Sequence, residues 1–168
     1  MTTDLRFELT ADQASHTVTV IREFNGRRQL VWDCHTRSEL LDQWFAPKPL
    51  TTQTRHMDFR AGGYWHYAMI TPEHERHWYR LDYRTIDPID GYTAQDSFCD
   101  EAGTINPDLP GSHWDVAFAD QGKRTLVTTM VRFASSDALQ AAIGMGLKDG
   151  LASTLERLDE LLLALQAA

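Results

Sequence analysis

The sequence is poor in cysteine, and its two cysteines, Cys34 and Cys99, lie far apart with no Cys-x-x-Cys spacing. Two free thiols in a reducing compartment fit this pattern better than a disulfide-built scaffold does. Long apolar runs are also missing: no stretch of about 18 apolar residues occurs, and the N-terminus has neither the basic cap nor the apolar segment of a signal peptide. We therefore expect a cytoplasmic protein without a membrane-spanning segment.

Basic residues are in deficit, with 16 lysines and arginines against 24 aspartates and glutamates, which gives a net charge of −8. A field of this sign repels nucleic-acid phosphates and anionic lipid surfaces, so we expect neither a nucleic acid nor a membrane as a partner. The chain also has no glycine-rich phosphate loop and no Ser/His/Asp or Cys/His signature. No cofactor and no catalytic set is indicated.

The sequence does contain enough apolar material for one domain. Its 168 residues are 42% hydrophobic, and neither a change of composition nor an internal repeat divides them. Residues 1–16 are polar and mixed, and we interpret them as an N-terminal arm or a short edge strand. Residues 17–168 are predicted to form the single domain.

Local patterns predict the elements of this domain. Alternating β-branched residues predict a strand at Thr17–Phe24. Helical spacing then indicates two short helices, and Thr36 with Glu39 has the spacing of a capping box that would start the second helix at Arg37. Glycine- and proline-containing turns separate the later segments with strand character. We predict these strands at residues 51–60, 64–70, 78–86, 92–98, 113–119 and 124–133, with a loop at 100–111.

One long amphipathic helix is predicted at residues 136–168. Its apolar stripe, which must be buried, consists of Leu139, Ile143, Leu147, Leu151, Leu155, Leu158, Leu162 and Leu165. Gly144, Gly146 and Gly150 interrupt the first half, although each costs roughly 1 kcal/mol relative to alanine. Close packing of another backbone or a local kink is the favoured explanation. A helix kept thin beside an empty space is the alternative.

The order of these elements indicates an α+β fold. A run of antiparallel strands with helices grouped at its two ends predicts a sheet that packs on one face against helices. We expect a curved antiparallel sheet of about six or seven strands around the long C-terminal helix, with two short helices after the first strand.

Several segments, in this order, resemble the SRPBCC or START-like superfamily, which has the helix-grip (Bet v 1-like) fold. Within it they resemble the group related to the C-terminal domain of activators of Hsp90 ATPase. The matching segments are Ile21–Phe24, Leu30–Trp32, Leu40–Pro47, Asp58–Trp65 and Gly150–Leu151. Ala61 stands where proline is more usual in the group, and Leu151 stands where many relatives have tryptophan. The Hsp90-stimulating proteins carry an additional N-terminal domain, so we do not expect direct stimulation here.

The resemblance implies an elongated apolar cavity between the sheet and the long helix, suited to a lipid or an aromatic, polyketide-like ligand. Leu151 in place of tryptophan, beside the three glycines, would leave room for it. By strand parity and helical spacing the expected lining is Trp44, Phe45, Trp65, Tyr67, Met69, Tyr79, Tyr83, Phe98, Trp114, Met130, Ile143, Met145, Leu147 and Leu151. Most of these residues would equally serve as ordinary core.

Histidines and aspartates supply the candidates for chemistry. His74 and His77 have a zinc-compatible spacing only in a helix, and their segment reads as a turn with no further ligands, so we predict no metal site. By parity His66 and His113 face away from the inward tryptophans of their strands. A register shifted by one residue would turn both into the cavity as general bases.

Asp82, Asp96 and Asp115 also fall within strands, where each is most simply a solvated residue of the outer face. Three functions therefore stay open. The leading hypothesis is a protein that binds a hydrophobic small molecule in an internal cavity. The second is a cyclase, dehydratase or hydrolase acting on a cavity-bound guest. The third is a chaperone- or protein-interaction module, with a homodimer as one form.

Overall fold

The computed structural model describes residues 5–167, which form eight strands and four helices. In chain order these are β1 (Phe7–Asp12), β2 (Thr17–Phe24), α1 (Arg28–Thr36), α2 (Ser38–Leu41), β3 (Thr51–Met57), β4 (Tyr64–Ile70), β5 (Arg76–Asp87), β6 (Gly91–Phe98), β7 (Ser112–Gln121), β8 (Arg124–Phe133), α3 (Ser136–Gly144) and α4 (Leu147–Ala167). The class is α+β, as predicted.

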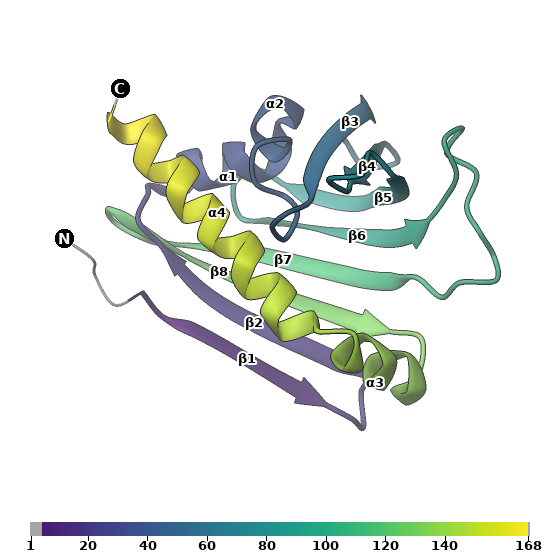
Figure 1. Cartoon of the computed structure of the whole chain (residues 1–168). Helices are drawn as coiled ribbons and strands as arrows, with labels where there is room; N and C mark the ends of the chain where they lie inside the picture. Colours follow the sequence, from purple (N-terminus) through teal and green to yellow (C-terminus); the bar gives the residue numbers. More distant parts are fainter. Residues whose placement is uncertain (1–4, 168) are drawn as a thin grey trace.

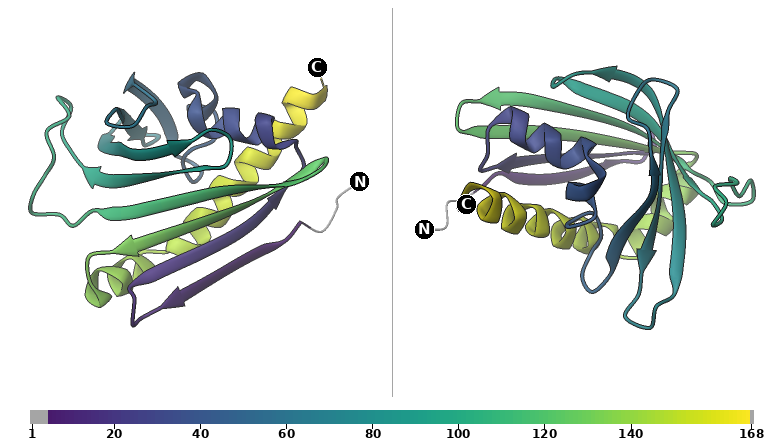
Figure 2. Two further views of the ribbon diagram at one scale, coloured as in Figure 1. Left: turned by 180° about the vertical axis from the view of Figure 1, so that it is seen from behind. Right: turned by 90° about the horizontal axis from the view of Figure 1, so that it is seen from above.

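All the strands belong to one antiparallel sheet in the order β1-β2-β8-β7-β6-β5-β4-β3. The sheet is curved and not closed, with α4 lying across its concave face (Figure 1). The view from behind shows the sheet in front of α4, and the view from above shows α1 and α4 on the same side of the sheet (Figure 2). This is the helix-grip arrangement. Its eight strands exceed the six or seven expected.

The additional strand comes from the N-terminal segment. β1 pairs with β2 from Phe7 opposite Arg22 to Asp12 opposite Thr17, at the edge of the sheet. Of the two interpretations of residues 1–16, the edge strand is therefore the one seen at residues 7–12. Residues 1–4 lie outside the described part of the chain.

The core lies between the concave face and the helices. Strand β2 alternates between half-buried and buried residues along its whole length, with Val18, Val20, Arg22 and Phe24 on the inner face. From the helices, Trp32, Leu158 and Leu162 are buried against the same interior. Period-two alternation thus predicts the buried face of β2, and the leucine spacing predicts the buried positions Leu158 and Leu162. Ile143 and Leu165, placed on the same buried stripe, are exposed, so that part of the prediction is wrong.

The predicted C-terminal helix is two helices. Gly146 has a φ of +91°, a conformation that side chains with a Cβ rarely adopt, and it separates α3 from α4. A Cβ at Gly144, Gly146 or Gly150 would meet no atom within 4 Å. Of the two favoured explanations, close backbone packing is therefore wrong, and a local interruption of the helix is seen at one of the three glycines, Gly146.

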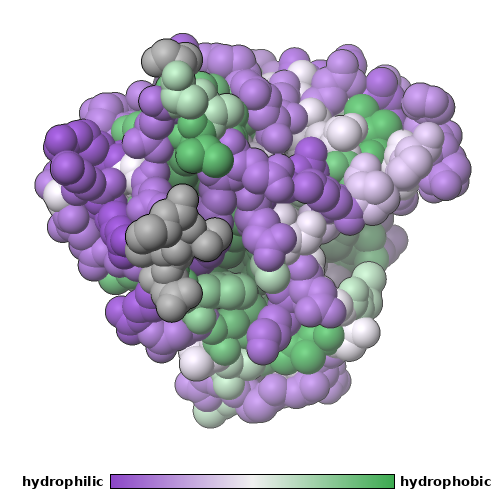
Figure 3. Space-filling view, turned by 60° about the vertical axis from the view of Figure 1, so that its left-hand side comes forward, coloured by the Kyte–Doolittle hydropathy of each residue, from purple (hydrophilic) through white to green (hydrophobic). Residues whose placement is uncertain are grey.

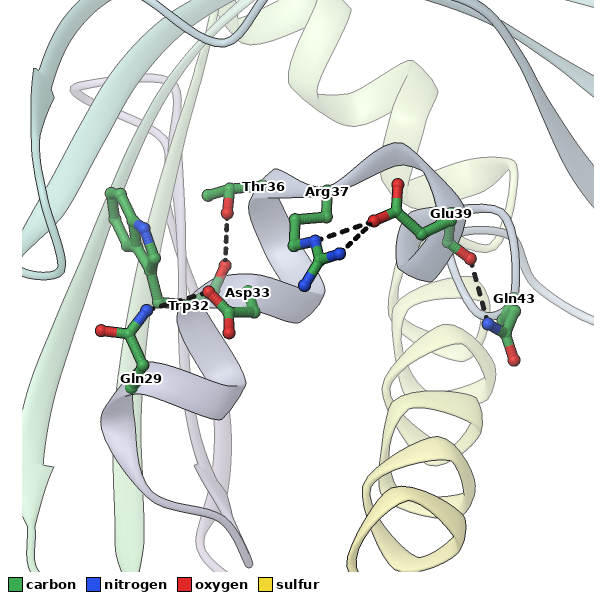
Figure 4. Close-up of polar contacts among 7 residues, drawn as sticks. All are labelled: Gln29, Trp32, Asp33, Thr36, Arg37, Glu39 and Gln43. Atoms are coloured by element: carbon green, nitrogen blue, oxygen red, sulfur yellow. Dashed lines mark hydrogen bonds and ion pairs between the residues drawn. The ribbon is translucent and has the colours of Figure 1, made fainter.

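The start of α2 also differs from the prediction. The hydroxyl of Thr36 donates back to the carbonyl oxygen of Trp32 at 2.9 Å, so it does not cap α2 (Figure 4). Arg37 occupies the N-cap position without a side-chain cap, and its guanidinium pairs with Glu39 at 2.7 Å. The capping box is wrong because Thr36 ends α1, where a hydroxyl bonds to the preceding turn.

The face of the molecule shown in Figure 3 is mostly hydrophilic, with separate hydrophobic patches, one of them on the C-terminal turns of α4. None of the helices within residues 5–167 combines the length and the apolar character needed to span a bilayer. Cys34 is buried and Cys99 is half-buried, and both are free thiols, as predicted.

Candidate ligand cavity

A cavity of about 200 Å³ lies between the concave face of the sheet and the α3–α4 break. Its lining comes from four strands, the loop before β7 and both C-terminal helices. These residues are Val18, Asp96, Ser97, Phe98, Pro110, Gly111, Ser112, Trp114, Val131, Phe133, Ala142, Leu147 and Leu151. Phe98 is 40% exposed, so the cavity reaches the surface beside the end of β6.

Strand parity and helical spacing bring these side chains together. Trp114 on β7 lies opposite Val131 on β8, which in turn lies opposite Val18 on β2, and all three residues line the cavity. Leu147 and Leu151 are four residues apart and therefore share one face of α4. The indole N–H of Trp114 donates to Ser112 Oγ at 2.9 Å, which fixes the ring orientation.

Asp96 is the ionisable residue of this lining. It stands on the inner face of β6, opposite Leu81 on β5 and Ser112 on β7. Its Oδ1 is inaccessible to solvent and has no hydrogen-bond partner. Burial raises the pKa of Asp96 to about 7, against the opposing effect of the Ser97 backbone N–H. The sequence-based placement of Asp96 on the outer face is therefore wrong.

The chemistry of this cavity follows from its lining. A mostly apolar space with one buried carboxyl can hold a compact apolar molecule and orient it through one polar group. A carboxyl with a pKa near 7 can also accept or donate a proton at neutral pH. Within residues 5–167, no three His, Cys, Asp or Glu side chains gather where they could hold a metal ion.

A larger depression, of about 330 Å³, is lined in part by Asp82, Arg84, Gln95 and Ser97. These residues alternate with the inward residues of β5 and β6, so the depression lies on the outer face. It is broad and open to solvent, with much polar lining. It lacks the apolar enclosure that a buried guest needs.

Comparison with known families identifies the scaffold. Residues 25–163 match the family model described as Activator of Hsp90 ATPase homolog 1-like protein. The chain belongs to this family. Its START-like fold is commonly a ligand-binding scaffold. No protein with curated functional information matches the chain in sequence.

Solved structures share this AHSA1-like fold. A protein from Arthrobacter aurescens, solved in solution by NMR, is 24% identical to this chain in sequence. Its TM-score is 0.86, and the alignment covers 92% of this chain and 90% of that one. A protein from Staphylococcus epidermidis is 28% identical, with a TM-score of 0.82 over 91% and 93%. The crystal structure of the AHSA1 protein from Silicibacter pomeroyi is 18% identical, with a TM-score of 0.68 over 89% and 99%.

The fourteen residues expected to line the cavity fall into three groups in this AHSA1-like structure. Four of them line the one described above: Phe98, Trp114, Leu147 and Leu151. Seven fill the core between the β3–β6 half of the sheet and α1–α2 and do not reach the cavity: Trp44, Phe45, Trp65, Tyr67, Met69, Tyr79 and Tyr83. In that core Trp65 stacks on Tyr67 with ring centroids 3.8 Å apart. Within residues 5–167, no single elongated space runs along the helix, because aromatic rings fill one end of the interior.

The other three expected residues do not face the interior. Met130 is 45% exposed on the outer face of β8, because Val127 and Val131 take the inner positions of that strand. Ile143 is 40% exposed and Met145 is 88% exposed. Met145 is the C-cap residue of α3, at the break between α3 and α4.

The two candidate general bases, His66 and His113, lie on the outer face, as parity predicts. His66 lies opposite Arg80 on the side of the sheet away from Trp65, yet it is buried. The loop between β6 and β7 covers it, and a ring nitrogen of His66 lies 3.0 Å from the carbonyl oxygen of Asp100. His113 lies on the same outer face, opposite Gln95. Neither histidine enters the cavity.

Proposed function

We propose that the chain binds a small, mostly apolar molecule in the cavity beside the α3–α4 break. The observation that carries this proposal is the cavity itself, about 200 Å³ of space with an aromatic and aliphatic lining. For comparison, an engineered apolar cavity of about 150 Å³ binds benzene or xenon. The volume therefore fits one ring with a short substituent. It is too small for a polycyclic polyketide or a long lipid.

The indole N–H groups provide the test, because one tryptophan lines the cavity and another does not. Trp114 donates to Ser112 Oγ inside the cavity, whereas Trp44 donates to the carbonyl oxygen of Cys34 within the solid core. We expect ethylbenzene to shift the Trp114 indole resonance in ¹H–¹⁵N spectra while the Trp44 resonance stays in place. Unchanged Trp114 resonances up to saturating ethylbenzene would contradict the proposal.

A second function, proton transfer to or from a bound guest, is favoured by one observation. Asp96 combines a position in the cavity with a pKa of about 7, which suits a general acid or base at neutral pH. Phenylacetone, with one ring and acidic protons next to its carbonyl, is a suitable probe. Exchange of these protons in D₂O, followed by NMR, would be accelerated by the wild type and not by Asp96→Asn. Equal exchange rates with and without protein would rule out this second function.

A further inference from the structure

We propose that the Asp96 carboxylate makes the cavity selective for apolar molecules that carry one protonated amine. This inference rests on the proposed binding function and specifies its ligand class. The class comprises small monoamines with a single ring or a short branched aliphatic group.

The first argument is the missing counterion. Within the described residues, Asp96 is part of no ion pair, and its Oδ1 is buried without a hydrogen-bond partner, so the Ser97 backbone N–H is the one group that partly compensates its charge. A carboxylate in an apolar site is costly unless a cation or donors compensate its charge. Since the lining contains no basic residue, a cation can come only from the guest.

The second argument comes from the rings around the carboxylate. Phe98, Trp114 and Phe133 line the same cavity as Asp96. Aromatic faces attract an ammonium group and also pack against the apolar part of a guest. A neutral apolar guest would gain the packing alone and would leave Asp96 without a cationic partner. The combination of carboxyl and rings thus favours amines over hydrocarbons of the same shape.

The third argument concerns protons. A guest amine with a lysine-like pKa of about 10 stays charged below pH 9 and pairs with ionised Asp96. The titratable neighbours that interact with Asp96 are Tyr67, Tyr79 and Cys99, and burial raises the pKa of each. All three stay neutral between pH 5 and pH 8. Amine binding must therefore remove the proton of Asp96 itself.

Three probes of one shape test the inference by isothermal titration calorimetry on the full chain: benzylamine, benzyl alcohol and ethylbenzene. At pH 8 we expect benzylamine to bind at least tenfold more tightly than ethylbenzene. Benzyl alcohol should lie between the two. Asp96→Asn should abolish the preference. Asp115→Asn, which removes an exposed carboxylate from neighbouring β7, should keep it.

Proton release provides a measurement that needs no variant. At pH 6, a pKa of about 7 for Asp96 implies release of about 0.9 proton per benzylamine bound, and close to none at pH 8.5. Titrations in buffers of different ionisation enthalpy measure this number. Equal affinities of benzylamine and ethylbenzene, or no proton release at pH 6, would overturn the inference while leaving the binding function in place. Failure of all three probes would overturn the binding function as well.

Discussion

Arg22 on β2 forms an ion pair with Asp159 on α4, 137 residues further along the chain. The Arg22 guanidinium also donates to the carbonyl oxygen of Glu23 and lies over the ring of Phe24, 4.8 Å from its centroid. Asp159 Oδ1 is buried without a partner, and burial raises the pKa of Asp159 against the effect of Arg22. One arginine therefore ties the long helix to the inner face of the sheet.

Removing one partner of this pair should be costly. Asp159→Ala leaves the Arg22 charge buried and uncompensated, and we expect a loss of about 3 kcal/mol in the free energy of unfolding, measured with urea. Glu160→Ala, which removes the exposed partner of Lys48 on the same helix, should change it by less than about 0.5 kcal/mol. Equal effects of the two substitutions would show that the Arg22–Asp159 pair contributes no more than a surface contact.

Filling the cavity should remove binding without unfolding the protein. Leu151→Trp places a larger side chain into the space of about 200 Å³, so ethylbenzene should no longer shift the Trp114 indole resonance. The free energy of unfolding should change by less than about 1 kcal/mol, because space is available. Leu155 packs against both core clusters, so Leu155→Trp should cost about 2 kcal/mol or more. If both variants are equally destabilised, position 151 is solid core.

The stability of the protein should depend on two buried groups with opposite effects of pH. Folding raises the pKa of Asp96 from 3.8 to about 7. The Asp96 contribution to the free energy of unfolding therefore falls as pH rises from 3.8 to about 7. Burial on folding lowers the pKa of His35 from 6.5 to about 4. The His35 contribution to the free energy of unfolding therefore falls as pH drops from 6.5 to about 4. The Asp96 shift corresponds to about 4 kcal/mol and the His35 shift to about 3 kcal/mol. The two effects nearly cancel between pH 4 and pH 6.5.

Asp96→Asn should remove the Asp96 effect and leave the His35 effect visible in the free energy of unfolding, measured with urea at several pH values. At pH 8 the variant should be about 4 kcal/mol more stable than the wild type, because no buried carboxylate remains. Between pH 6.5 and pH 4 the variant should lose about 3 kcal/mol through His35, while the wild type stays nearly level. Parallel pH profiles for the two proteins would contradict the assignment of the raised pKa to Asp96.

The glycines at the helix break should respond differently to alanine. Gly146→Ala forces a Cβ into a φ of +91°, and we expect it to lower the free energy of unfolding by about 1 kcal/mol. Gly144→Ala is the matched control, because Gly144 is helical, has no positive φ and has open space around its Cβ position. It should raise stability by up to about 1 kcal/mol. Gains from both variants would mean that the break is not required.

Period-two alternation predicted the fold and most inward faces, and it failed where residue type was allowed to outweigh parity. Tyr92 and Ala94 are buried, so parity alone places Asp96 inside. It was assigned to the outer face because carboxylates are usually solvated. Met130 is expected inside by strand parity, but the buried positions of β8, Val127 and Val131, show the opposite parity and place Met130 outside.

Other features depended on long-range structure that local patterns do not contain. The parity of His66 was right, but its burial comes from a loop that begins 33 residues later and folds over the outer face. Gly146 looked like a helical position because leucines continue on both sides, and only the positive φ identifies the break. The size of the cavity depends on how the rings of the core fill the rest of the interior, which no single segment determines.

The pairing of β2 with β8 also determines when the sheet can form during synthesis. Each inner residue of β2 has its partner more than a hundred positions later, as in Arg22 opposite Val127. Long-range pairing of this kind slows folding, because the loop must close before any contact is gained. On the ribosome, the edge of β2 that pairs with β8 therefore stays unpaired until β8 has emerged. A nascent chain stopped before residue 124 would expose Val18, Val20 and Phe24 to chaperones.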